Sequence, residues 1–250
     1  MNALSVDISV LASEKFLGFP DVRFGFSYRQ GGVSAPPFGL NLSHNVNDSQ
    51  ENVRRNRAMF FGSLGIAVDR LAIPKQCHST NALRAHAPGA YESCDAILTD
   101  RKGVFLAITV ADCVPIFIFD PVKKAVGAIH AGWRGTTQEI VEKTIKKMES
   151  EFGSHAANLL AFVGPSARSC CYEVGYEVAE GFEKSFVVKR EGKQFLDLKG
   201  SNVSQLCRAG IPEENLEISP YCTICNPELF HSYRRDKERS GRMMGVIGLV

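Results

Sequence analysis

Two histidines and one cysteine in the middle part of the chain are of the residue types that form a three-ligand zinc site. His130 begins the segment His-Ala-Gly-Trp-Arg-Gly, which contains the only tryptophan. Cys113 lies upstream in Thr-Val-Ala-Asp-Cys-Val-Pro, and His78 lies in Gln-Cys-His-Ser. Three protein ligands leave a fourth zinc position open for water or substrate, as in catalytic sites. We therefore interpret His78, Cys113 and His130 as a catalytic metal site.

Each of these residues also has a simpler interpretation. A free cysteine such as Cys113 is most often a small buried hydrophobe. A histidine after an apolar strand, such as His130, is most often a hydrogen-bonded core residue, and His78 alone is uninformative. What favours a site is that Cys113, beside Asp112, and His130 both lie at the ends of apolar runs.

Two further alternatives keep the site but change its role. Without metal, Cys113 and His130 form a thiolate–imidazole pair with the thiolate as nucleophile. Zinc on Cys113 would quench that nucleophile, so the two mechanisms exclude each other. The third alternative is a zinc-stabilised regulatory or binding protein, which an open ligand position and nearby arginines argue against.

The loop 132–135 lies between an apolar run and an expected helix. A glycine-containing loop at a helix N-terminus offers backbone N–H groups to an anion. Arg134 adds a charged donor suited to phosphate or carboxylate. The pattern fits an anion site and equally a tight turn with a solvent-facing arginine.

Four of the eight cysteines form two close pairs. Cys222 and Cys225 have zinc-ligand spacing, but a structural site needs two more ligands, and the sequence shows no second pair at that spacing. We interpret them as two thiols near a turn. Cys170 and Cys171 are adjacent, too close for an unstrained disulfide, and are expected to be free.

Composition is that of an ordinary globular protein. The chain has 250 residues, 44% hydrophobic and 22% charged, with a formal net charge of +2. The weak, unclustered charge argues against nucleic-acid binding. The N-terminus lacks the pattern of a secretory signal, and no apolar run reaches the length of a membrane span. We expect a cytoplasmic protein with free thiols, in one domain of residues 1–250.

The expected strands are grouped near the middle of the chain, with helices between and after them. Apolar runs predict strands at 24–28, 96–99, 104–110, 115–119, 125–131 and 159–163, several of them buried on both faces. Caps and helical spacing predict helices at 48–64, 136–152, 178–186 and 202–209, the second beginning with a Thr136–Glu139 capping box. The fold class is α/β or α+β: one layered domain of mixed central β-sheets flanked by helices.

Seven segments together resemble one protein family. They are GFSYRQGGVS (25–34), PPFGLNLSHNVND (36–48), QCHS (76–79), TVADCVPIFIFD (109–120), AIHAGWRGT (128–136), GPSARSCCYEVG (164–175) and FHSYRRD (230–236). The chain resembles the YfiH/YlmD family, also called the laccase-domain or multicopper polyphenol oxidoreductase family. The set is specific, whereas no single piece would be.

The resemblance implies a single α/β domain related to toxin-type cysteine hydrolases, and a zinc bound by His78, Cys113 and His130. It also implies purine nucleoside chemistry: phosphorolysis of adenosine, inosine and methylthioadenosine, and deamination of adenosine. The partners would be purine nucleosides and phosphate. The family has glycine after the first histidine, where this chain has Ser79, so the pocket wall differs there.

These implications give the remaining polar residues roles. Zinc would act as a Lewis acid or supply hydroxide for attack on purine C6, with Asp112 as proton shuttle. In phosphorolysis, phosphate attacks ribose C1′, and Arg29 and Arg134 would hold the phosphate or the charged transition state. Asn41 would bond a ribose hydroxyl or a base edge. The sequence leaves open the preferred nucleoside, the resident metal and the oligomeric state.

The family's oxidase label can be tested by counting ligands. A multicopper oxidase needs on the order of ten histidines for its copper sites. This chain has six: His44, His78, His86, His130, His155 and His231. A single copper could occupy the site in place of zinc, but four-copper chemistry cannot be built within one chain. A copper-dependent polyphenol oxidase is therefore the less favoured alternative.

Overall fold

Two large β-sheets form the centre of the protein. The structure, a computed structural model, describes residues 8–250, so residues 1–7 of the expected 1–250 domain lie outside the described residues. The first sheet has the strand order β1 (Val10–Leu11), β2 (Val22–Ser27), β15 (Met243–Leu249), β7 (Phe105–Val110), β3 (Leu71–Pro74) and β5 (Gly89–Tyr91). The second has the order β14 (Leu216–Ile218), β10 (Leu160–Val163), β8 (Val114–Asp120), β9 (Ala125–Ala131), β6 (Ala96–Thr99) and β4 (Ala82–Arg84).

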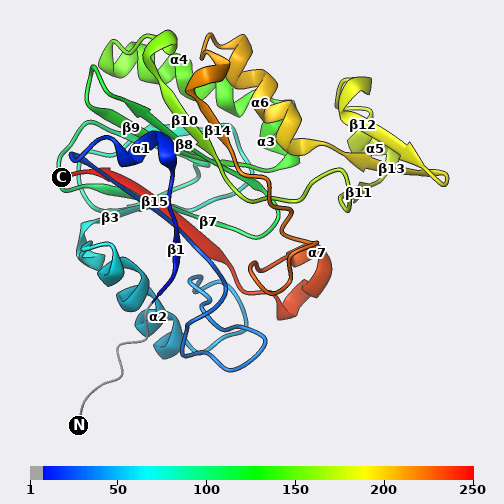
Figure 1. Ribbon diagram of the computed structural model, residues 1–250, viewed down its shortest axis with the longest axis horizontal. Helices are drawn as coiled ribbons and strands as arrows, with labels where there is room; N and C mark the ends of the chain where they lie inside the picture. The colour runs from blue at the N-terminus through cyan, green and yellow to red at the C-terminus, as the bar shows by residue number, and fades with distance from the viewer. Residues whose placement is uncertain (1–7) are drawn as a thin grey trace.

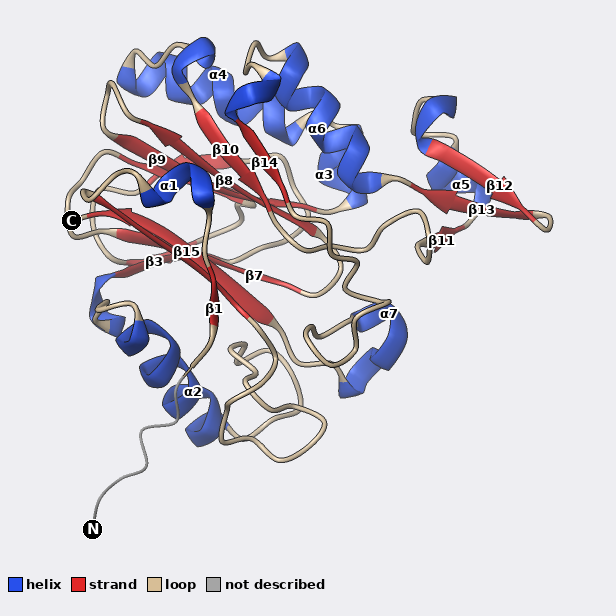
Figure 2. Ribbon diagram, in the orientation of Figure 1, coloured by secondary structure: helices blue, strands red, loops and turns tan. Residues whose placement is uncertain are grey.

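Helices cover the outer faces of both sheets (Figures 1 and 2). The helices are α1 (Glu14–Leu17), α2 (Gln50–Ser63), α3 (Trp133–Thr137), α4 (Ile140–Phe152), α5 (Tyr176–Ala179), α6 (Leu198–Arg208) and α7 (Tyr233–Asp236). Helices α4 and α6 lie on the second sheet, and α2 lies on the first. A small sheet of order β11 (Glu173–Val174), β13 (Lys193–Leu196) and β12 (Val187–Arg190) projects to one side with α5.

The two large sheets pack face to face over an aromatic core. This layer contains Phe26, Leu106 and Ile247 from the first sheet and Phe117, Phe119 and Val126 from the second. Strands β8 and β9 are buried along their whole length because the other sheet covers one face and helices cover the other. That is why they are near-continuous apolar runs in the sequence. Both sheets mix parallel and antiparallel pairs, so the predicted mixed sheets flanked by helices are confirmed.

The six predicted strands are all present, with ends within two residues of those predicted. Three helix predictions need correction. The helix expected at 202–209 begins earlier, at Leu198, because the Asp197 side chain caps it by accepting from the Gly200 backbone N–H. The helix expected at 136–152 begins earlier as α3, at Trp133 within the expected loop 132–135. Glu139, with a φ of 62°, then separates α3 from α4. The Thr136 hydroxyl donates to the Gly132 carbonyl at 2.9 Å instead of capping a helix. Residues 178–186 form only the end of α5 and a 3-10 turn at Lys184–Phe186, with Gly181, a poor helix former, between them.

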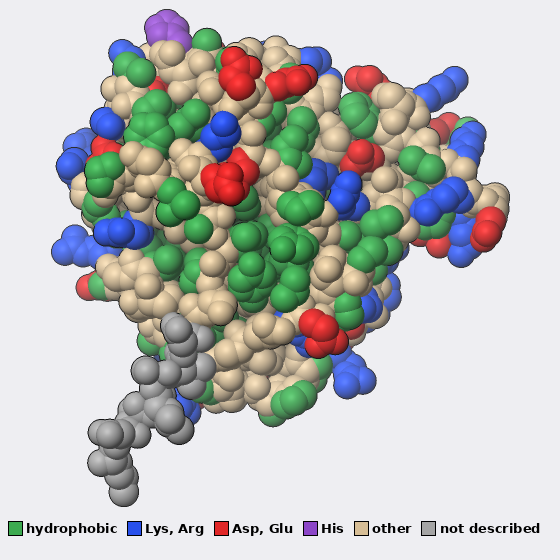
Figure 3. All heavy atoms as spheres, viewed as in Figure 1, with side chains coloured by type: hydrophobic (Ala, Val, Ile, Leu, Met, Phe, Trp, Pro, Cys, Tyr) green, Lys and Arg blue, Asp and Glu red, His purple; other side chains and the backbone are tan. Residues whose placement is uncertain are grey.

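The surface shows charges of both signs. On the face drawn in Figure 3, acidic and basic side chains are interspersed, and hydrophobic side chains gather in the middle of the view. This agrees with the small net charge of +2. Among the described residues, none of the helices combines the length and apolarity that crossing a bilayer requires.

Candidate metal centre

Cys113 lies in the turn through which the chain passes from one large sheet to the other, between β7 and β8. Asp112, just before it, is buried with a φ of 89°, an uncommon conformation for a residue other than glycine. Its Oδ1 accepts from Thr223 Oγ1 at 2.6 Å, and its Oδ2 accepts from Ser232 Oγ at 3.0 Å and from the Arg234 backbone N–H at 2.6 Å. These bonds hold the turn, and with it Cys113, in a fixed position.

His130 lies near the end of β9, opposite Pro115 of β8. Its side chain is 5% exposed, and its Nδ1 is 2.8 Å from Asp95 Oδ1. A carboxylate only accepts hydrogen bonds, so Nδ1 carries the proton and Nε2 keeps a lone pair for a metal. A histidine held by a carboxylate in this way is the usual arrangement around protein-bound metals.

His78 lies in the segment 75–81, which also crosses from the first sheet to the second. It has a φ of 61° and is exposed. Asp95 shapes this segment: its carboxylate accepts from the backbone N–H of Cys77 at 3.2 Å, of His78 at 3.0 Å and of Ser79 at 2.6 Å. One buried carboxylate thus positions two of the three candidate ligands.

The three candidate ligands converge. One donor atom each from His78, Cys113 and His130 lie within 4.8 Å of one another, and the two imidazole rings have centroids 5.0 Å apart. Gly132 lies against the group: a Cβ there would be 2.8 Å from His78 Cδ2 and 3.2 Å from Cys113 Sγ. Only a residue without a side chain leaves the two ligands where they are. The structure therefore brings together the three residues that the sequence suggested as one site.

The electrostatics favour a thiolate beside an imidazolium when no cation is bound. Burial raises the pKa of Cys113, but the charge and hydrogen bonds of His130 and His78 outweigh it and bring this pKa to about 6. Burial lowers the pKa of His130, but the Cys113 thiolate and the Asp95 hydrogen bond raise it to about 9. Burial likewise raises the pKa of Asp95, yet His130 and Ser79 hold it well below its usual range. A thiolate at neutral pH is the form in which cysteine binds metal.

The donor set fits a zinc ion. Imidazole nitrogen and thiolate sulfur are both zinc ligands, and catalytic zinc sites have three protein ligands, which leave a coordination position free. His78 is the exposed member, so the cluster opens to solvent on its side. The same donors also suit copper.

The three residues predicted to bind substrate each have partners within the protein. Arg29 donates from Nη1 to the Pro227 carbonyl and from Nη2 to the Pro37 carbonyl, which leaves other N–H donors for a ligand. Arg134 is exposed, and its guanidinium stacks over Trp133 at 4.3 Å from the ring centroid. Asn41 is fully buried, and its amide bonds Ser43, Asp48 and the Arg242 backbone. Contacts of these three residues with substrate stay predictions, as does proton transfer by Asp112.

Besides Asp95, the sequence alone did not point to two other residues near Cys113, which are Tyr172 and Arg234. Burial raises the pKa of Tyr172 to about 12, and the Cys113 thiolate adds to that effect. The Arg234 guanidinium lies over the Tyr172 ring at 5.2 Å from its centroid. Both residues belong to segments quoted for the family resemblance, 164–175 and 230–236, and that is the signal that could have found them.

Comparisons with known proteins identify the family and the fold. Residues 23–250 match the family model described as multi-copper polyphenol oxidoreductase laccase. A Deinococcus radiodurans protein named purine nucleoside phosphorylase is 41% identical over 233 residues, covering 91% of this chain and 89% of that protein. The crystal structure of Bacillus licheniformis hypothetical protein YfiH superposes with a TM-score of 0.91 at 34% identity, covering 97% of each chain. YlmD from Geobacillus stearothermophilus gives a TM-score of 0.89 at 30% identity, covering 95% of this chain and 94% of that one.

Proposed function

The chain belongs to the multi-copper polyphenol oxidoreductase laccase family, and we propose that it is a zinc-dependent purine nucleoside phosphorylase. Several of its relatives are named purine nucleoside phosphorylase. Its substrates are purine nucleosides and phosphate. The observation that supports this most is the convergence of His78, Cys113 and His130 within 4.8 Å, with Asp95 holding His130. A cluster with three donors and one free position is built for catalysis rather than for structure alone.

The chain's own residues bind and orient the reactants in this proposal. Phosphate oxygen forms a bond to ribose C1′ while the C1′–N9 bond breaks, and the electron pair leaves with the purine base. Arg29 and Arg134 hold the phosphate, as both keep free N–H donors that suit its oxygens. Zinc, when bound by His78, Cys113 and His130, supplies a Lewis acid that polarises an oxygen in the site.

Proton transfer to the departing base needs a group close to the cluster. Asp112 is our candidate because it adjoins Cys113. Its oxygens already accept from Thr223, Ser232 and Arg234, so Asp112 must exchange one of these donors for a proton from the attacking dihydrogen phosphate. It then gives that proton to the departing base. We extend the proposal to adenosine, inosine and methylthioadenosine as substrates, and to deamination of adenosine, in which water adds at C6 and ammonia leaves.

A second candidate function rests on the thiolate itself. The pKa of Cys113, which burial raises but His130 and His78 bring down to about 6, leaves it ionised at neutral pH beside a protonated His130. That pair is the activated nucleophile of cysteine hydrolases. Because the same sulfur lone pair would bind zinc, a zinc-loaded protein cannot use this mechanism.

A product assay tests the proposal and separates the two mechanisms. Purified protein of measured metal content is incubated with adenosine and phosphate, beside a Cys113→Ala variant, and the products are identified by mass spectrometry. We expect adenine with ribose 1-phosphate, or inosine, from zinc-loaded protein alone, and background levels from the variant. No product from fully loaded protein would refute the nucleoside proposal, and activity that rises on zinc removal would favour the hydrolase.

A further inference from the structure

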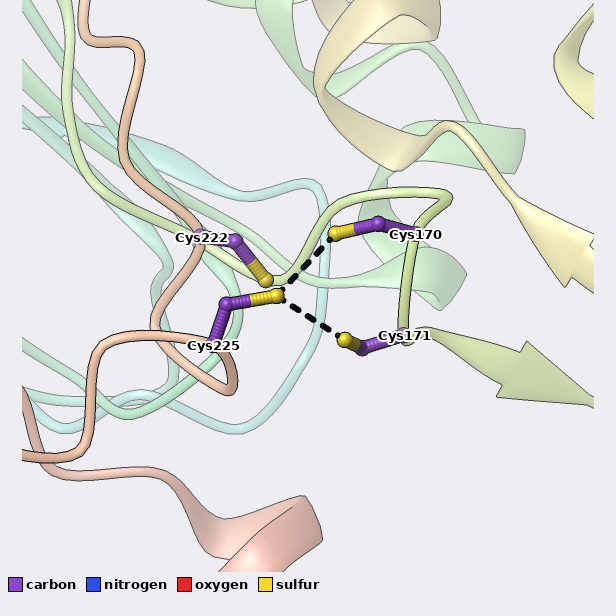
Figure 4. Close-up of side chains that lie close together, drawn as sticks. All are labelled: Cys170, Cys171, Cys222 and Cys225. Carbon is purple, nitrogen blue, oxygen red and sulfur yellow. Dashed lines mark hydrogen bonds between the residues drawn. The ribbon is translucent and has the colours of Figure 1, made fainter.

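A second group of metal-ligating side chains lies apart from the proposed catalytic cluster. Figure 4 shows the sulfur atoms of Cys170, Cys171, Cys222 and Cys225 pointing toward one another from two loops. Cys225 Sγ is 3.0 Å from Cys171 Sγ and 3.4 Å from Cys170 Sγ, and all four sulfur atoms lie within 4.8 Å of one another. We propose that these four cysteines bind a structural Zn²⁺ ion.

The sheet explains why two sequence-distant pairs meet. One pair follows β10 and the other follows β14, and these strands are parallel neighbours, from Ala161 opposite Leu216 to Val163 opposite Ile218. Parallel neighbours end at the same edge of a sheet, so the loops that follow them leave side by side.

Bonds other than sulfur contacts hold the two loops together. A further bridge pairs Ser166 with Cys222, and the Thr223 backbone N–H donates to the Ser166 carbonyl at 3.1 Å. Arg168 Nη1 donates to the Pro220 carbonyl at 2.6 Å. These bonds hold the two loops side by side without help from the sulfur atoms, so the site is pre-organised.

The spacing of the sulfur atoms fits a tetrahedral ion. Zinc–sulfur bonds of about 2.3 Å place the sulfur atoms of a tetrahedron about 3.8 Å apart. The observed separations of 3.0 and 3.4 Å, with an upper limit of 4.8 Å for the whole group, bracket that value. A tetrahedral set of four sulfur ligands selects zinc or an iron–sulfur centre, and Cys222 and Cys225 have the two-residue gap common in structural zinc sites.

The charge around the cluster also suits such a complex. Four thiolates and one Zn²⁺ leave two negative charges. Two arginines bond the backbone beside the cysteines: Arg190 Nη2 donates to the carbonyls of Ser169 at 2.7 Å and Cys170 at 3.0 Å, and Arg168 bonds Pro220. Both guanidinium groups can offset that charge from close by.

Both loops reach Asp112, the neighbour of Cys113. Thr223, between Cys222 and Cys225, donates its hydroxyl to Asp112 Oδ1 at 2.6 Å. The backbone N–H of Ala167, on the loop leading to Cys170, donates to the Asp112 carbonyl at 2.9 Å. A zinc ion joining the loops would fix the turn that carries the catalytic cysteine, which makes the four cysteines positioning residues.

Metal stoichiometry tests the site. The full-length protein is produced with zinc in the medium and purified without chelator, and zinc per chain is measured. We expect about two zinc ions for wild type and for Cys207→Ser, and about one for Cys113→Ala and for Cys225→Ser, since each of these last two variants loses one ligand set. Cys207 is a matched control because it is a free, half-buried cysteine outside both clusters. The Cys225→Ser variant should also show a lower Tm, and Cys207→Ser should not.

X-ray absorption at the zinc edge of the Cys113→Ala variant is a second measurement. This variant keeps all four cysteines, so the test holds even if Cys225→Ser does not fold. We expect a first shell of sulfur only, at about 2.3 Å. Zinc-free Cys113→Ala protein, four cysteines found as disulfides, or iron in place of zinc would each overturn the proposal. Metal content and absorption spectra do not depend on nucleoside turnover, so failure here is distinguishable from failure of the proposed activity.

Discussion

The two clusters of metal-ligating side chains differ in where their donors come from and in how many there are. His78, Cys113 and His130 come from crossings between the large sheets and from strand β9, and Asp95 links two of them. Cys170, Cys171, Cys222 and Cys225 come from two loops at one edge of a sheet. Three donors leave a position for substrate, whereas four sulfur ligands close the coordination shell.

The contrast suggests that the two clusters have different roles, one in reactivity and one in structure. Buried charge tunes the three-donor cluster for reactivity. The pKa of Cys113 is about 6 and that of His130 about 9, so the thiol is the stronger acid of the two, the reverse of their ordinary order. In each case burial opposes the shift and the partner's charge overcomes it. The loops of the four-cysteine cluster reach the first cluster through Asp112, which accepts from Thr223 and from the backbone N–H of Ala167. One cluster would do the chemistry, and the other would hold the turn on which the chemistry depends.

Removing metal should give the largest difference between the clusters. Dialysis against a chelator is expected to abolish phosphorolysis while the first zinc equivalent leaves, because an open coordination position gives the chelator access. The four-sulfur site should lose its zinc later. Metal content and activity are followed in the same samples, and added zinc should restore turnover. If activity declined only when the second zinc equivalent left, the four-cysteine cluster would be the catalytic site and the three-donor cluster the structural one.

The Asp95→Asn variant should come next in size. The amide removes the charge that orients His130 and gathers the backbone N–H groups of the His78 segment. Loss of such a partner costs about 10- to 100-fold in metal affinity or activity. Zinc affinity is measured by competition with a chromophoric chelator.

A matched control for this variant is Asp120→Asn. Asp120 is equally buried, at 0% exposed, but its Oδ1 accepts from the backbone of Val122 and Lys123, away from the cluster. It should alter stability and leave zinc affinity unchanged. Equal zinc affinity in the two variants would remove Asp95 from the metal site.

How much of this could be read from the sequence depends on how local each feature is. Strands β6 and β9 match their predicted bounds because continuous apolar runs are local signals. Strand β15 was missed although it lies in the middle of the first sheet. Its Gly245 suggests a turn, but a Cβ there would be 2.2 Å from the Phe117 ring, so the glycine permits close packing of the two sheets.

The site followed the same rule. His78, Cys113 and His130 could be suggested from residue type and family resemblance, and the structure brings them together. Asp95 could not be suggested, because its contact with His130 depends on the register in which β6 pairs with β9, where Ala96 is opposite Ile129. The four cysteines likewise needed the pairing of β10 with β14, which the spacing of the pairs does not reveal.

Alkylation of metal-free protein should show an effect of intermediate size. Burial raises the pKa of Cys113 but its histidine partners lower it to about 6, so its rate with iodoacetamide should rise as pH increases through 6 and level off above pH 7. An ordinary thiol titrates near about 8.5. Peptide mapping by mass spectrometry resolves Cys113 from the other cysteines, and zinc should protect it. A midpoint near that of an ordinary thiol would show that the pair with His130 does not form.

The Gly132→Ala variant should give the smallest change, and it tests how rigid the three-donor cluster is. The new Cβ would be 2.8 Å from His78 Cδ2 and 3.2 Å from Cys113 Sγ. We expect zinc affinity to fall only a few-fold, because exposed His78 can move aside. Gly62→Ala is the control: nothing lies within 4 Å of that Cβ within α2, so it should stabilise the protein by about 0.5–1 kcal/mol. Unchanged zinc affinity and turnover in Gly132→Ala would mean that the His78 segment adapts freely to its surroundings. Pre-organisation would then distinguish only the four-cysteine cluster.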